Sequence, residues 1–553
     1  MTVAELLVGR ADDAHPGIVS EGSSWSWRDV AAESAVRGAA LGELRGPGPF
    51  HIGILLENVP EFVFLLGGAA LAGATLVGIN PTRRGDELAR DIRHTDCQVV
   101  LTDSQQAGLL RGLDLGAADG HVLHVDGTEY RALLDRHRGA GLPADLPGPE
   151  TQYLLLFTSG STGAPKAVRM TQGRAARTAG RSVFTPDDIL YCAMPLFHGN
   201  SLLGNLFPAM AKGASVVLKR RFSASDFVPD IRRHGCTFFN CVGRALSYIL
   251  AVPESPEERD TRLKWVLGPE SSTRDIAEFT RRFGCPVIEG YGSSENAVVI
   301  QPAAGMPAGA LGRPSRGADV AIIDPATGKE CPPARFDDNG RILNAEEAIG
   351  EIVGRNTVGN FEGYYNNPEA EAERTRGGWY WSGDLGYRDE DGWFWFAGRT
   401  SDWLRVDGEN FASAPVERIL ARFPPVVGVA VYPVPDPLMA DQVMAALQLE
   451  DGAGLDPAAF EQFLASQPDL GTKWAPRFVR LVPALPVTGT GKVDKRPLRA
   501  GRHHTGSASQ RTARGEPYRR LTADDVARLR ASFEEHGRVA LIPPVSTPAP
   551  AGG

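Results

Sequence analysis

The chain has 553 residues, of which 42% are hydrophobic and 23% are charged, and it carries a formal net charge of −9. This length predicts two or more domains, and the composition is that of a soluble globular protein. Nucleic acids and anionic membranes bind basic surfaces, so the acidic balance argues against either one as the main partner.

The first 81 residues contain an apolar run but no targeting segment. The chain does not begin with a basic region followed by an apolar core, so we expect no secretory signal. Residues 62–81 carry no charge and are nearly long enough to cross a bilayer. Glycines interrupt this run, and Pro60 indicates a helix start. We therefore predict a buried helix that ends near Gly73, a following strand at 75–79, and no integral membrane segment.

Buried strands alternate with helical patterns through the first 220 residues or so. Residues 26–44 are amphipathic and predict a helix. Short apolar runs predict strands at 52–56, 75–79, 98–102, 153–157, 189–194 and 214–218. This alternation indicates an α/β fold with mostly parallel sheets that helices cover on both faces. Farther along, an acidic turn before the aromatic run 392–396 predicts a hairpin.

The six cysteines form no Cys-x-x-Cys pair and no cluster with histidine. Neither a zinc site nor a disulfide framework is indicated. We expect reduced thiols in a cytoplasmic protein.

The most informative stretch is 153–166, where strand-forming residues run into a Ser/Thr/Gly turn that closes on Lys166. Glycines let backbone N–H groups point inward, hydroxyl groups donate, and the lysine adds charge, which is the composition of a phosphate cradle. It is not a Walker A loop, because Ala164 and Pro165 precede the lysine and Ala167 follows it. On these residues alone, a phosphate site and a solvated turn are both open.

Further motifs follow in order along the chain. Together with the loop they are Thr158-Ser159-Gly160-Ser161-Thr162-Gly163 with Lys166, Tyr291-Gly292-Ser293-Ser294-Glu295, Ser382-Gly383-Asp384, Gly398-Arg399 with Gly408-Glu409-Asn410, and Gly489-Thr490-Gly491-Lys492. Over roughly residues 1–500 the chain resembles the adenylate-forming superfamily, which includes acyl-CoA and aryl-CoA synthetases, peptide-synthetase adenylation domains and luciferases. It is most similar to bacterial acyl-CoA synthetases of the very-long-chain and fatty-acid-transport type.

This resemblance implies a domain organisation. A large N-terminal adenylation domain with a β-rich subdomain would occupy 1–399, a hinge 400–402, and a small mobile α+β lid domain 403–500. Ser401 departs from the Asp or Lys that is common in the hinge. The remainder, 501–553, is expected to be a linker, a short helix and a disordered tail.

The residues themselves support that view of the tail. The stretch 501–517 is polar and basic and predicts a linker. Thr522 with Asp525 forms a capping box that starts a helix, whose apolar face we expect to dock on the rest of the protein. A homodimer is compatible with the sequence, which does not fix the oligomeric state.

The motifs imply adenylation, in which an oxygen of an acid attacks the α-phosphate of ATP and pyrophosphate leaves. The reaction gathers negative charge, so cations and oriented dipoles are needed where it accumulates. The loop from Thr158 to Gly163 and Lys166 would hold the β- and γ-phosphates. Glu295 would bind Mg²⁺, which usually takes one or two carboxylates together with phosphate oxygens.

Other nucleotide contacts are implied by the same motifs. Tyr291 would stack on adenine, and Asp384 and Arg399 would bind the ribose. The remaining residues assigned to the nucleotide site are Gly268, Gly292 and Ser294.

Lys492 is expected to act on the reacting groups. It follows flexible glycines, and its long stem would let the ammonium reach the acid and the α-phosphate together. A charge that arrives only when a lid closes stabilises the transition state more than the resting complex. In the family, the small domain then rotates and presents the Gly408-Glu409-Asn410 loop to a thiol, here CoA as the expected co-substrate.

The acid pocket is expected to include His198, Asn240, Arg244, Glu270 and Gly290. His198 stands at the family's aromatic-or-histidine position and joins Lys492, Glu295 and Lys166 as a catalytic candidate. Burying Asn240, Arg244 and Glu270 unpaired would cost free energy, so they favour a polar or aryl substrate over a plain fatty acid.

Three functions are therefore compared. The first is an AMP-forming ligase that activates an acyl or aryl acid and transfers it to CoA. The alternative is a diazotase of natural-product biosynthesis, which activates nitrite in the same way and transfers it to an aromatic amine. The third, a non-enzymatic nucleotide or acyl sensor, is disfavoured because Lys492 and Glu295 are both present.

Overall fold

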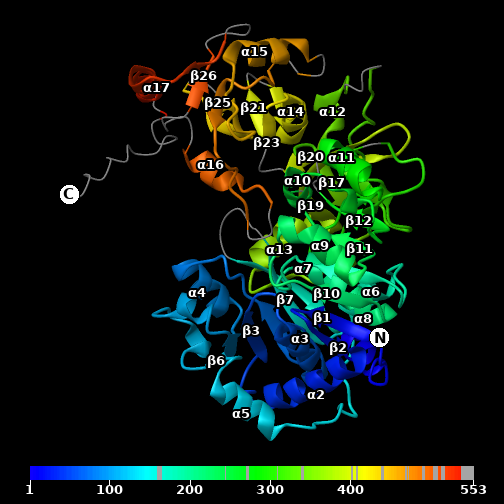
Figure 1. Cartoon of the computed structure of the whole chain (residues 1–553). Coiled ribbons are helices and arrows are strands. Elements are labelled where there is room, and N and C mark those ends of the chain that lie inside the picture. Colours follow the sequence, from blue (N-terminus) through cyan, green and yellow to red (C-terminus); the bar gives the residue numbers. More distant parts are fainter. Residues whose placement is uncertain are drawn as a thin grey trace, which may run out of the picture. The chain divides into compact units, whose positions relative to one another are not determined.

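The computed structural model describes the chain except residues 159–164, 243, 270–272, 308, 338–341, 400–402, 407–408, 438–440, 468–469, 471–472, 489–491, 502–507, 512–516, 537 and 539–553. The chain forms two compact units (Figure 1). Unit 1 is Met1–Pro302, Asn356–Tyr380 and Gly489–Lys492, and unit 2 is Ala303–Arg355, Trp381–Thr488 and Val493–Gly553. The predicted boundaries at 1–399, 400–402, 403–500 and 501–553 are not tested by this division and stay a prediction, with the hinge outside the described residues.

The first sheet of unit 1 has seven strands and is mostly parallel. Their order is β18 (Tyr364–Tyr365), β8 (Lys166–Thr171), β7 (Gln152–Thr158), β4 (Thr75–Gly78), β3 (His51–Leu55), β5 (Val99–Thr102) and β6 (Val122–His124). β8 pairs antiparallel with both β7 and β18, and the other pairs are parallel. The four strands predicted here lie within one residue of their expected positions.

The second sheet of unit 1 also has seven strands. Their order is β13 (Val287–Ile288), β12 (Trp265–Leu267), β11 (Phe238–Asn240), β9 (Ile189–Cys192), β10 (Ser215–Leu218), β1 (Pro16–Ser20) and β2 (Ser23–Ser26). All neighbours are parallel except β1 and β2. β9 and β10 confirm predicted strands, whereas β11, β12 and β13 are only two or three residues long and were not predicted.

Helices surround these sheets. They are α1 (Val3–Val8), α2 (Trp27–Glu43), α3 (Pro60–Ala72), α4 (Gly85–His94), α5 (Thr128–Arg136), α6 (Gln172–Gly180), α7 (Gly199–Ser201), a π-helical turn (Leu202–Leu206), α8 (Phe207–Lys212), α9 (Ala224–His234), α10 (Arg244–Ala251), α11 (Thr273–Phe283) and α13 (Pro368–Arg374). One apolar core joins both sheets, because buried residues of β3, β7, β9 and β10 belong to the same cluster as those of α2, α3 and α8.

The uncharged run at 62–81 is a buried helix and strand, as predicted. α3 ends at Gly73, whose φ of 66° is left-handed, and β4 follows. A Cβ atom on Gly67 would lie 2.1 Å from Ser34 Oγ, so this glycine permits the close packing of α3 on α2. Within the described part of the chain, no helix has the length and apolar character needed to span a membrane.

The described residues of unit 2 form several sheets. A four-stranded sheet has the order β16 (Val320–Ile323), β17 (Gly350–Gly354), β19 (Tyr380–Arg388) and β20 (Phe394–Arg399), and β21 (Trp403–Val406) pairs with β22 (Glu409–Ala412). A five-stranded sheet has the order β23 (Val426–Pro435), β24 (Asp441–Leu449), β25 (Phe478–Leu481), β26 (Ala508–Gln510) and β27 (Arg519–Arg520). Its helices are α12 (Ala345–Ala348), α14 (Ser413–Leu420), α15 (Pro457–Ser466), α16 (Lys495–Gly501) and α17 (Ala523–Glu535).

The predicted aromatic hairpin is formed by β19 and β20. Its acidic turn has a structural role that was not foreseen. One carboxylate oxygen of Asp389 accepts from the Trp393 backbone N–H at 2.8 Å, and the other accepts from the Trp395 indole at 3.0 Å. Asp389 therefore closes the turn and fixes an aromatic side chain at once.

The stretch that we expected to be a linker contains a short strand. β26 lies within the stretch 501–517 that we expected to be a linker, and its Ala508 is completely buried. α17 starts at the predicted capping box of Thr522 and Asp525. Phe533 on this helix is completely buried, so the helix docks on unit 2.

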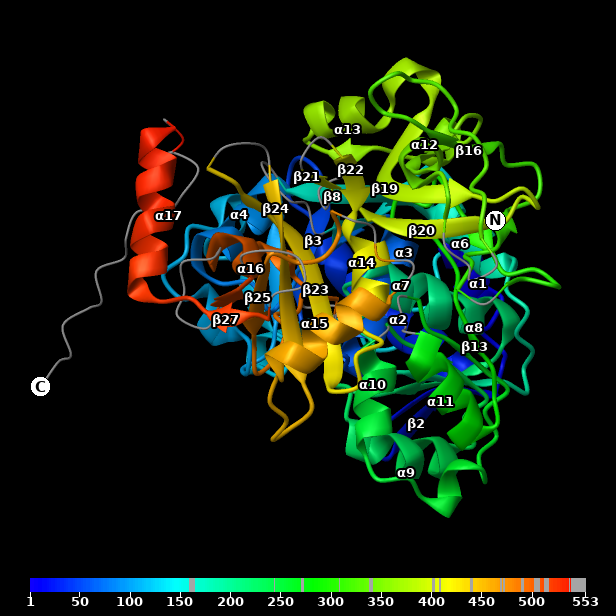
Figure 2. The same cartoon turned by 90° about the horizontal axis from the view of Figure 1, so that it is seen from above.

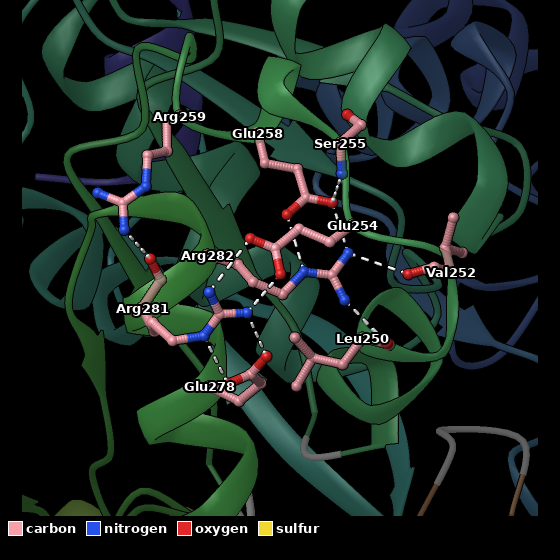
Figure 3. A network of polar contacts seen from close by, with 9 residues as sticks. All are labelled: Leu250, Val252, Glu254, Ser255, Glu258, Arg259, Glu278, Arg281 and Arg282. Atoms are coloured by element: carbon pink, nitrogen blue, oxygen red, sulfur yellow. Dashed lines mark hydrogen bonds and ion pairs between the residues drawn. The ribbon is translucent and has the colours of Figure 1, made fainter.

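A buried ion pair ties together the helices that lead away from the predicted acid pocket. α9, α10 and α11 lie next to one another (Figure 2). Glu258 and Arg282, with 2% and 4% of their side chains exposed, form an ion pair, and Arg282 also donates to the carbonyls of Leu250 at 2.8 Å and Val252 at 3.0 Å (Figure 3). This contact joins the end of α10 to the end of α11.

Replacing Arg282 with Leu is expected to destabilise the protein by about 3–5 kcal/mol, because it leaves the Glu258 carboxylate buried without its cation. Urea unfolding followed by circular dichroism measures the change. Arg281→Leu is the matched control. Arg281 is half exposed and pairs with Glu254 and Glu278, so its loss should cost less than about 1 kcal/mol. Equal effects of the two variants would contradict the structural role of the buried pair.

Candidate active site

The predicted pocket residues of unit 1 gather at one edge of the second sheet. Asn240 ends β11, Gly268 follows β12, and Gly290 and Tyr291 follow β13. His198 lies in the segment after β9. Because these strands are parallel neighbours, their carboxyl ends lie at the same edge, which is where open α/β sheets bind ligands.

Lys166 and Thr158 lie opposite each other at the end of a hairpin. β7 and β8 pair antiparallel, with Thr158 in register with Lys166. Of the residues that connect them, 159–164 lie outside the described residues, and these include Ser159, Gly160, Ser161, Thr162 and Gly163. The two ends of the predicted phosphate loop are therefore fixed by the sheet, with the lysine at the first position of β8.

The Tyr291–Glu295 motif forms a turn that buries its carboxylate. Tyr291 and Ile300 exchange backbone hydrogen bonds of 3.0 and 2.9 Å, and Asn296 at the turn has a left-handed φ of 53°. Glu295 is only 6% exposed, and one of its oxygens accepts a hydrogen bond of 2.8 Å from the Tyr364 hydroxyl. Burial and the charge of Glu295 raise the pKa of Tyr364, so the phenol stays protonated and donates.

Arg174 holds the same turn from the other side. This buried residue of α6 donates to the Ser294 carbonyl at 2.6 Å and to the Arg169 carbonyl at 3.0 Å. Its guanidinium lies 3.8 Å from Glu362, which also accepts from the Thr171 backbone and hydroxyl, each at 2.7 Å. Burial lowers the pKa of Arg174, and the charges of Glu362 and Glu295 oppose that shift.

Tyr364, Arg174 and Glu362 were not among the predicted site residues. Tyr364 comes from a segment, Asn356–Tyr380, that belongs to unit 1 although its neighbours in sequence belong to unit 2. The only local indication was the aromatic pair that follows Gly363. The contacts that join these side chains to Glu295, Ser294 and Thr171 span 69 to 191 residues of the chain, beyond the reach of local patterns.

His198 is positioned by Asn58 and kept neutral. The Asn58 side chain donates to the Met194 carbonyl and accepts from the Leu196 backbone, each at 2.8 Å, which fixes the segment before His198. Burial, together with the positive charge of Lys492, lowers the pKa of His198 to about 3. The ring is therefore neutral at physiological pH. The structure brings together two of the predicted catalytic residues, His198 and Lys492.

Asn240 is used by the fold as well as by the pocket. It is completely buried, and its amide donates to the Asn200 carbonyl at 3.2 Å. A Cβ on Gly204 of the π-helical turn would lie 2.4 Å from the Asn240 amide nitrogen, so this turn packs directly against it. The side chain of Arg244 and all of Glu270 lie outside the described residues, and their predicted roles stay predictions.

The two predicted ribose contacts are neighbours in unit 2. Asp384 on β19 is the cross-strand partner of Arg399 on β20. Gly383 before it has a left-handed φ of 74°, and its N–H donates to Glu351 at 2.6 Å. The side chain of Arg399 and the Gly408-Glu409-Asn410 side chains lie outside the described residues.

The donor set fits a magnesium ion that arrives with ATP. Among the residues that the structure describes, no three His, Cys, Asp or Glu side chains gather to hold a metal. Glu295 supplies one carboxylate, and Mg²⁺ usually combines one or two carboxylates with phosphate oxygens and water. A single buried carboxylate that Tyr364 links to Lys166 therefore suits a nucleotide-borne Mg²⁺.

A surface hollow of about 630 Å³ lies elsewhere in unit 1. Residues at the starts of β1, β9 and β10 line it, so it occupies the amino-terminal edge of the second sheet. It contains none of the predicted site residues. The carboxyl-terminal edge remains the candidate site.

Comparisons with known proteins agree with this geometry. Residues 9–365 match the family model of AMP-binding enzymes, and residues 415–492 match that of the AMP-binding enzyme C-terminal domain. A steroid-22-oyl-CoA synthetase of Rhodococcus jostii strain RHA1 is 51% identical over 547 residues, which cover 97% of this chain and 98% of that protein. A medium/long-chain-fatty-acid–CoA ligase of Mycobacterium tuberculosis is 45% identical over 505 residues, which cover 90% of this chain and 96% of that protein.

Solved structures share the fold. An anthranilate CoA ligase in complex with anthranoyl-AMP has a TM-score of 0.79 at 23% identity, covering 91% of this chain and 97% of that chain. ATP-bound MatB from Rhodopseudomonas palustris has a TM-score of 0.77 at 24% identity, covering 90% of this chain and 98% of that chain. The predicted α/β class is confirmed.

The neutral state of His198 predicts a dependence of stability on pH. Its folded pKa of about 3 lies below the ordinary value of 6.5, so between these values the unfolded state binds more protons and stability falls as pH falls. From about pH 7 to about pH 4.5, wild type should lose about 2–3 kcal/mol more than His198→Gln. Urea unfolding at both pH values measures this.

His121→Gln, at an exposed position, is the control and should keep the wild-type pH dependence. If His198→Gln keeps it too, the histidine is not held neutral by burial.

Proposed function

The chain belongs to the AMP-binding enzyme family, and we propose that it is an ATP-dependent acyl-CoA ligase for a steroid acid whose carboxylate is carbon 22. It activates the acid as an acyl-AMP, releases pyrophosphate and transfers the acyl group to CoA. The proposed substrate rests on one observation, which is the 51% identity, over 97% of this chain, with the steroid-22-oyl-CoA synthetase. A medium- or long-chain fatty acid is the second candidate, because the ligases named for those acids are 45% identical.

The fold itself uses one polar group of the predicted acid pocket. The Asn240 amide, one basis for expecting a polar or aryl substrate, donates to Asn200 within the fold. The curated relatives named above are CoA ligases, so nothing in them favours the diazotase.

In the first half-reaction a carboxylate oxygen of the acid attacks the α-phosphorus of ATP, and the bond from that phosphorus to the leaving pyrophosphate breaks. The loop between Thr158 and Lys166 holds the β- and γ-phosphates through N–H groups, hydroxyl groups and the ammonium. Glu295 would bind the Mg²⁺ that accompanies ATP, which supplies charge neutralisation at the phosphates. Lys492 places its charge at the reacting carboxylate and α-phosphate.

The remaining roles are part of the same proposal. Tyr291 stacks on adenine, and Asp384 with Arg399 binds the ribose. A hinge at 400–402 lets the lid domain at 403–500 present the Gly408-Glu409-Asn410 loop to CoA. The reaction takes place in the cytoplasm, where ATP and CoA are available, and the six cysteines, all buried and unpaired with one another, suit that compartment.

The substrate proposal is tested by AMP and thioester formation with ATP, Mg²⁺ and CoA. A steroid with its carboxylate at carbon 22 is expected to give a kcat/KM at least about 10-fold above that of a C8–C16 fatty acid, which corresponds to about 1.4 kcal/mol of differential binding. A higher value with fatty acids would establish the second candidate. Turnover with nitrite and an aromatic amine, without CoA, would contradict the ligase.

Lys492→Ala is expected to lower acyl-AMP formation by about 100-fold to 1,000-fold, because a charge aimed at the transition state is lost. Thioester formation from synthetic acyl-AMP and CoA should change little. Pyrophosphate exchange and single-turnover thioester assays separate the two steps. Arg496→Ala, which removes a more exposed cation paired with Asp494, is the control. Equal losses in both steps would contradict the role of Lys492.

A further inference from the structure

Tyr364 is placed beside the strand that begins with Lys166 by a pairing that the sequence did not suggest. β18 pairs antiparallel with β8, with Tyr364 opposite Val168 and Tyr365 opposite Ala167. The Arg169 N–H donates to the Gly363 carbonyl at 3.1 Å, and the Asn367 side chain donates to the Pro165 carbonyl at 3.1 Å. These bonds attach the segment to the strand that begins with Lys166.

The tyrosine side chain contacts both predicted phosphate-site charges. Its hydroxyl donates to Glu295 Oε1 at 2.8 Å, and its ring centroid lies 5.9 Å from Lys166 Nζ. Tyr364 is 3% exposed, so water does not compete for either contact. The ring of Phe361 packs edge-on against it, with 5.0 Å between centroids, and restrains its orientation.

Arg374 completes the group. Burial alone would lower the pKa of Arg374, but the neighbouring Tyr364, Tyr380 and Glu295 raise it. Lys166 Nζ lies 3.7 Å from Glu373 Oε2 on the same helix, α13. One short segment, 364–374, therefore supplies a partner to each of the two predicted phosphate-site charges.

We propose that Tyr364 is a positioning residue that holds the Glu295 carboxylate in the orientation in which it meets nucleotide-borne Mg²⁺, while its ring fixes the Lys166 stem. The inference rests on the proposed function, in which Glu295 and Lys166 serve the phosphates. A hydrogen bond to a carboxylate that binds a metal sets its direction, and losing such an outer partner typically lowers metal affinity by 10-fold to 100-fold. Tyr364 touches neither substrate nor metal in this role.

Tyr364→Phe tests the hydroxyl alone, because the ring and its contact with Lys166 remain. Binding of Mn²⁺·ATP, followed by the electron paramagnetic resonance of free Mn²⁺, should weaken about 10-fold. The Mg²⁺ concentration needed for half-maximal pyrophosphate exchange should rise by a similar factor, and saturating Mg²⁺ should restore most of the rate. Thermal unfolding confirms that the variant is folded.

Tyr365→Phe is the matched control. Successive strand residues face opposite sides of a sheet, and the Tyr365 hydroxyl donates at 2.8 Å to Asp96, away from Glu295. The Tyr365→Phe variant also removes one tyrosine hydroxyl group, at the neighbouring position in the chain. It should leave the affinity for Mn²⁺·ATP unchanged.

A double variant decides whether Tyr364 acts through Glu295. If it does, Tyr364→Phe adds no loss of metal affinity to Glu295→Gln. Wild-type affinity in Tyr364→Phe, or a full additional loss in the double variant, overturns the inference and leaves the proposed function standing. Wild-type affinity in Glu295→Gln overturns the metal role of Glu295 in the proposed function, and the inference with it.

Discussion

The candidate site is organised around one carboxylate, Glu295, that is almost completely buried. Moving an isolated carboxylate out of water costs several kcal/mol, and the cost is recovered only through close cations and hydrogen bonds. Glu295 has the Tyr364 hydroxyl at 2.8 Å, and its charge acts on both Arg174 and Arg374. The positive and negative side chains of this group compensate one another, so they are already in position before ATP binds. Such preorganised charge favours a reaction that accumulates phosphate charge, because little reorganisation remains to be done.

Backbone pairing, rather than the long side chains themselves, sets these positions. The β7–β8 hairpin places Thr158 opposite Lys166, β18 adds Tyr364 to the same sheet, and Arg174 binds the carbonyl of Ser294. The acid side of the site uses the second sheet, whose parallel strands end together. The buried pair of Glu258 and Arg282 secures the helices behind that edge. A site built on strand ends and closed turns holds its geometry more precisely than one built on free loops.

The sequence was informative where a local pattern has one structural solution. Apolar runs predicted β3, β4, β5, β7, β9 and β10 but not β1, β2 or β8, Gly73 predicted the end of α3, and the capping box at Thr522 predicted the start of α17. It failed for β11, β12 and β13, which are too short to show a period, and for β26, a polar strand that its neighbours stabilise. It also missed Tyr364 and Arg174, because hydrogen bonds between residues 69 and 120 apart depend on tertiary packing alone.

The two ends of the reaction centre are electrostatically different, and this difference suits the proposed order of events. At the predicted phosphate end, the buried Glu295 accepts from Tyr364, and its charge acts on Arg174 and Arg374. At the acid end His198 is neutral, so the acid's carboxylate meets no permanent imidazolium that would stabilise its resting state. The positive charge that acts on His198 comes from Lys492. This lysine lies on a segment whose sequence neighbours belong to unit 2. In the proposed mechanism Lys492 arrives with the lid, and a cation that arrives only then lowers the barrier more than a permanent charge would. In the proposed mechanism, the neutral His198 and the arriving Lys492 therefore have complementary roles.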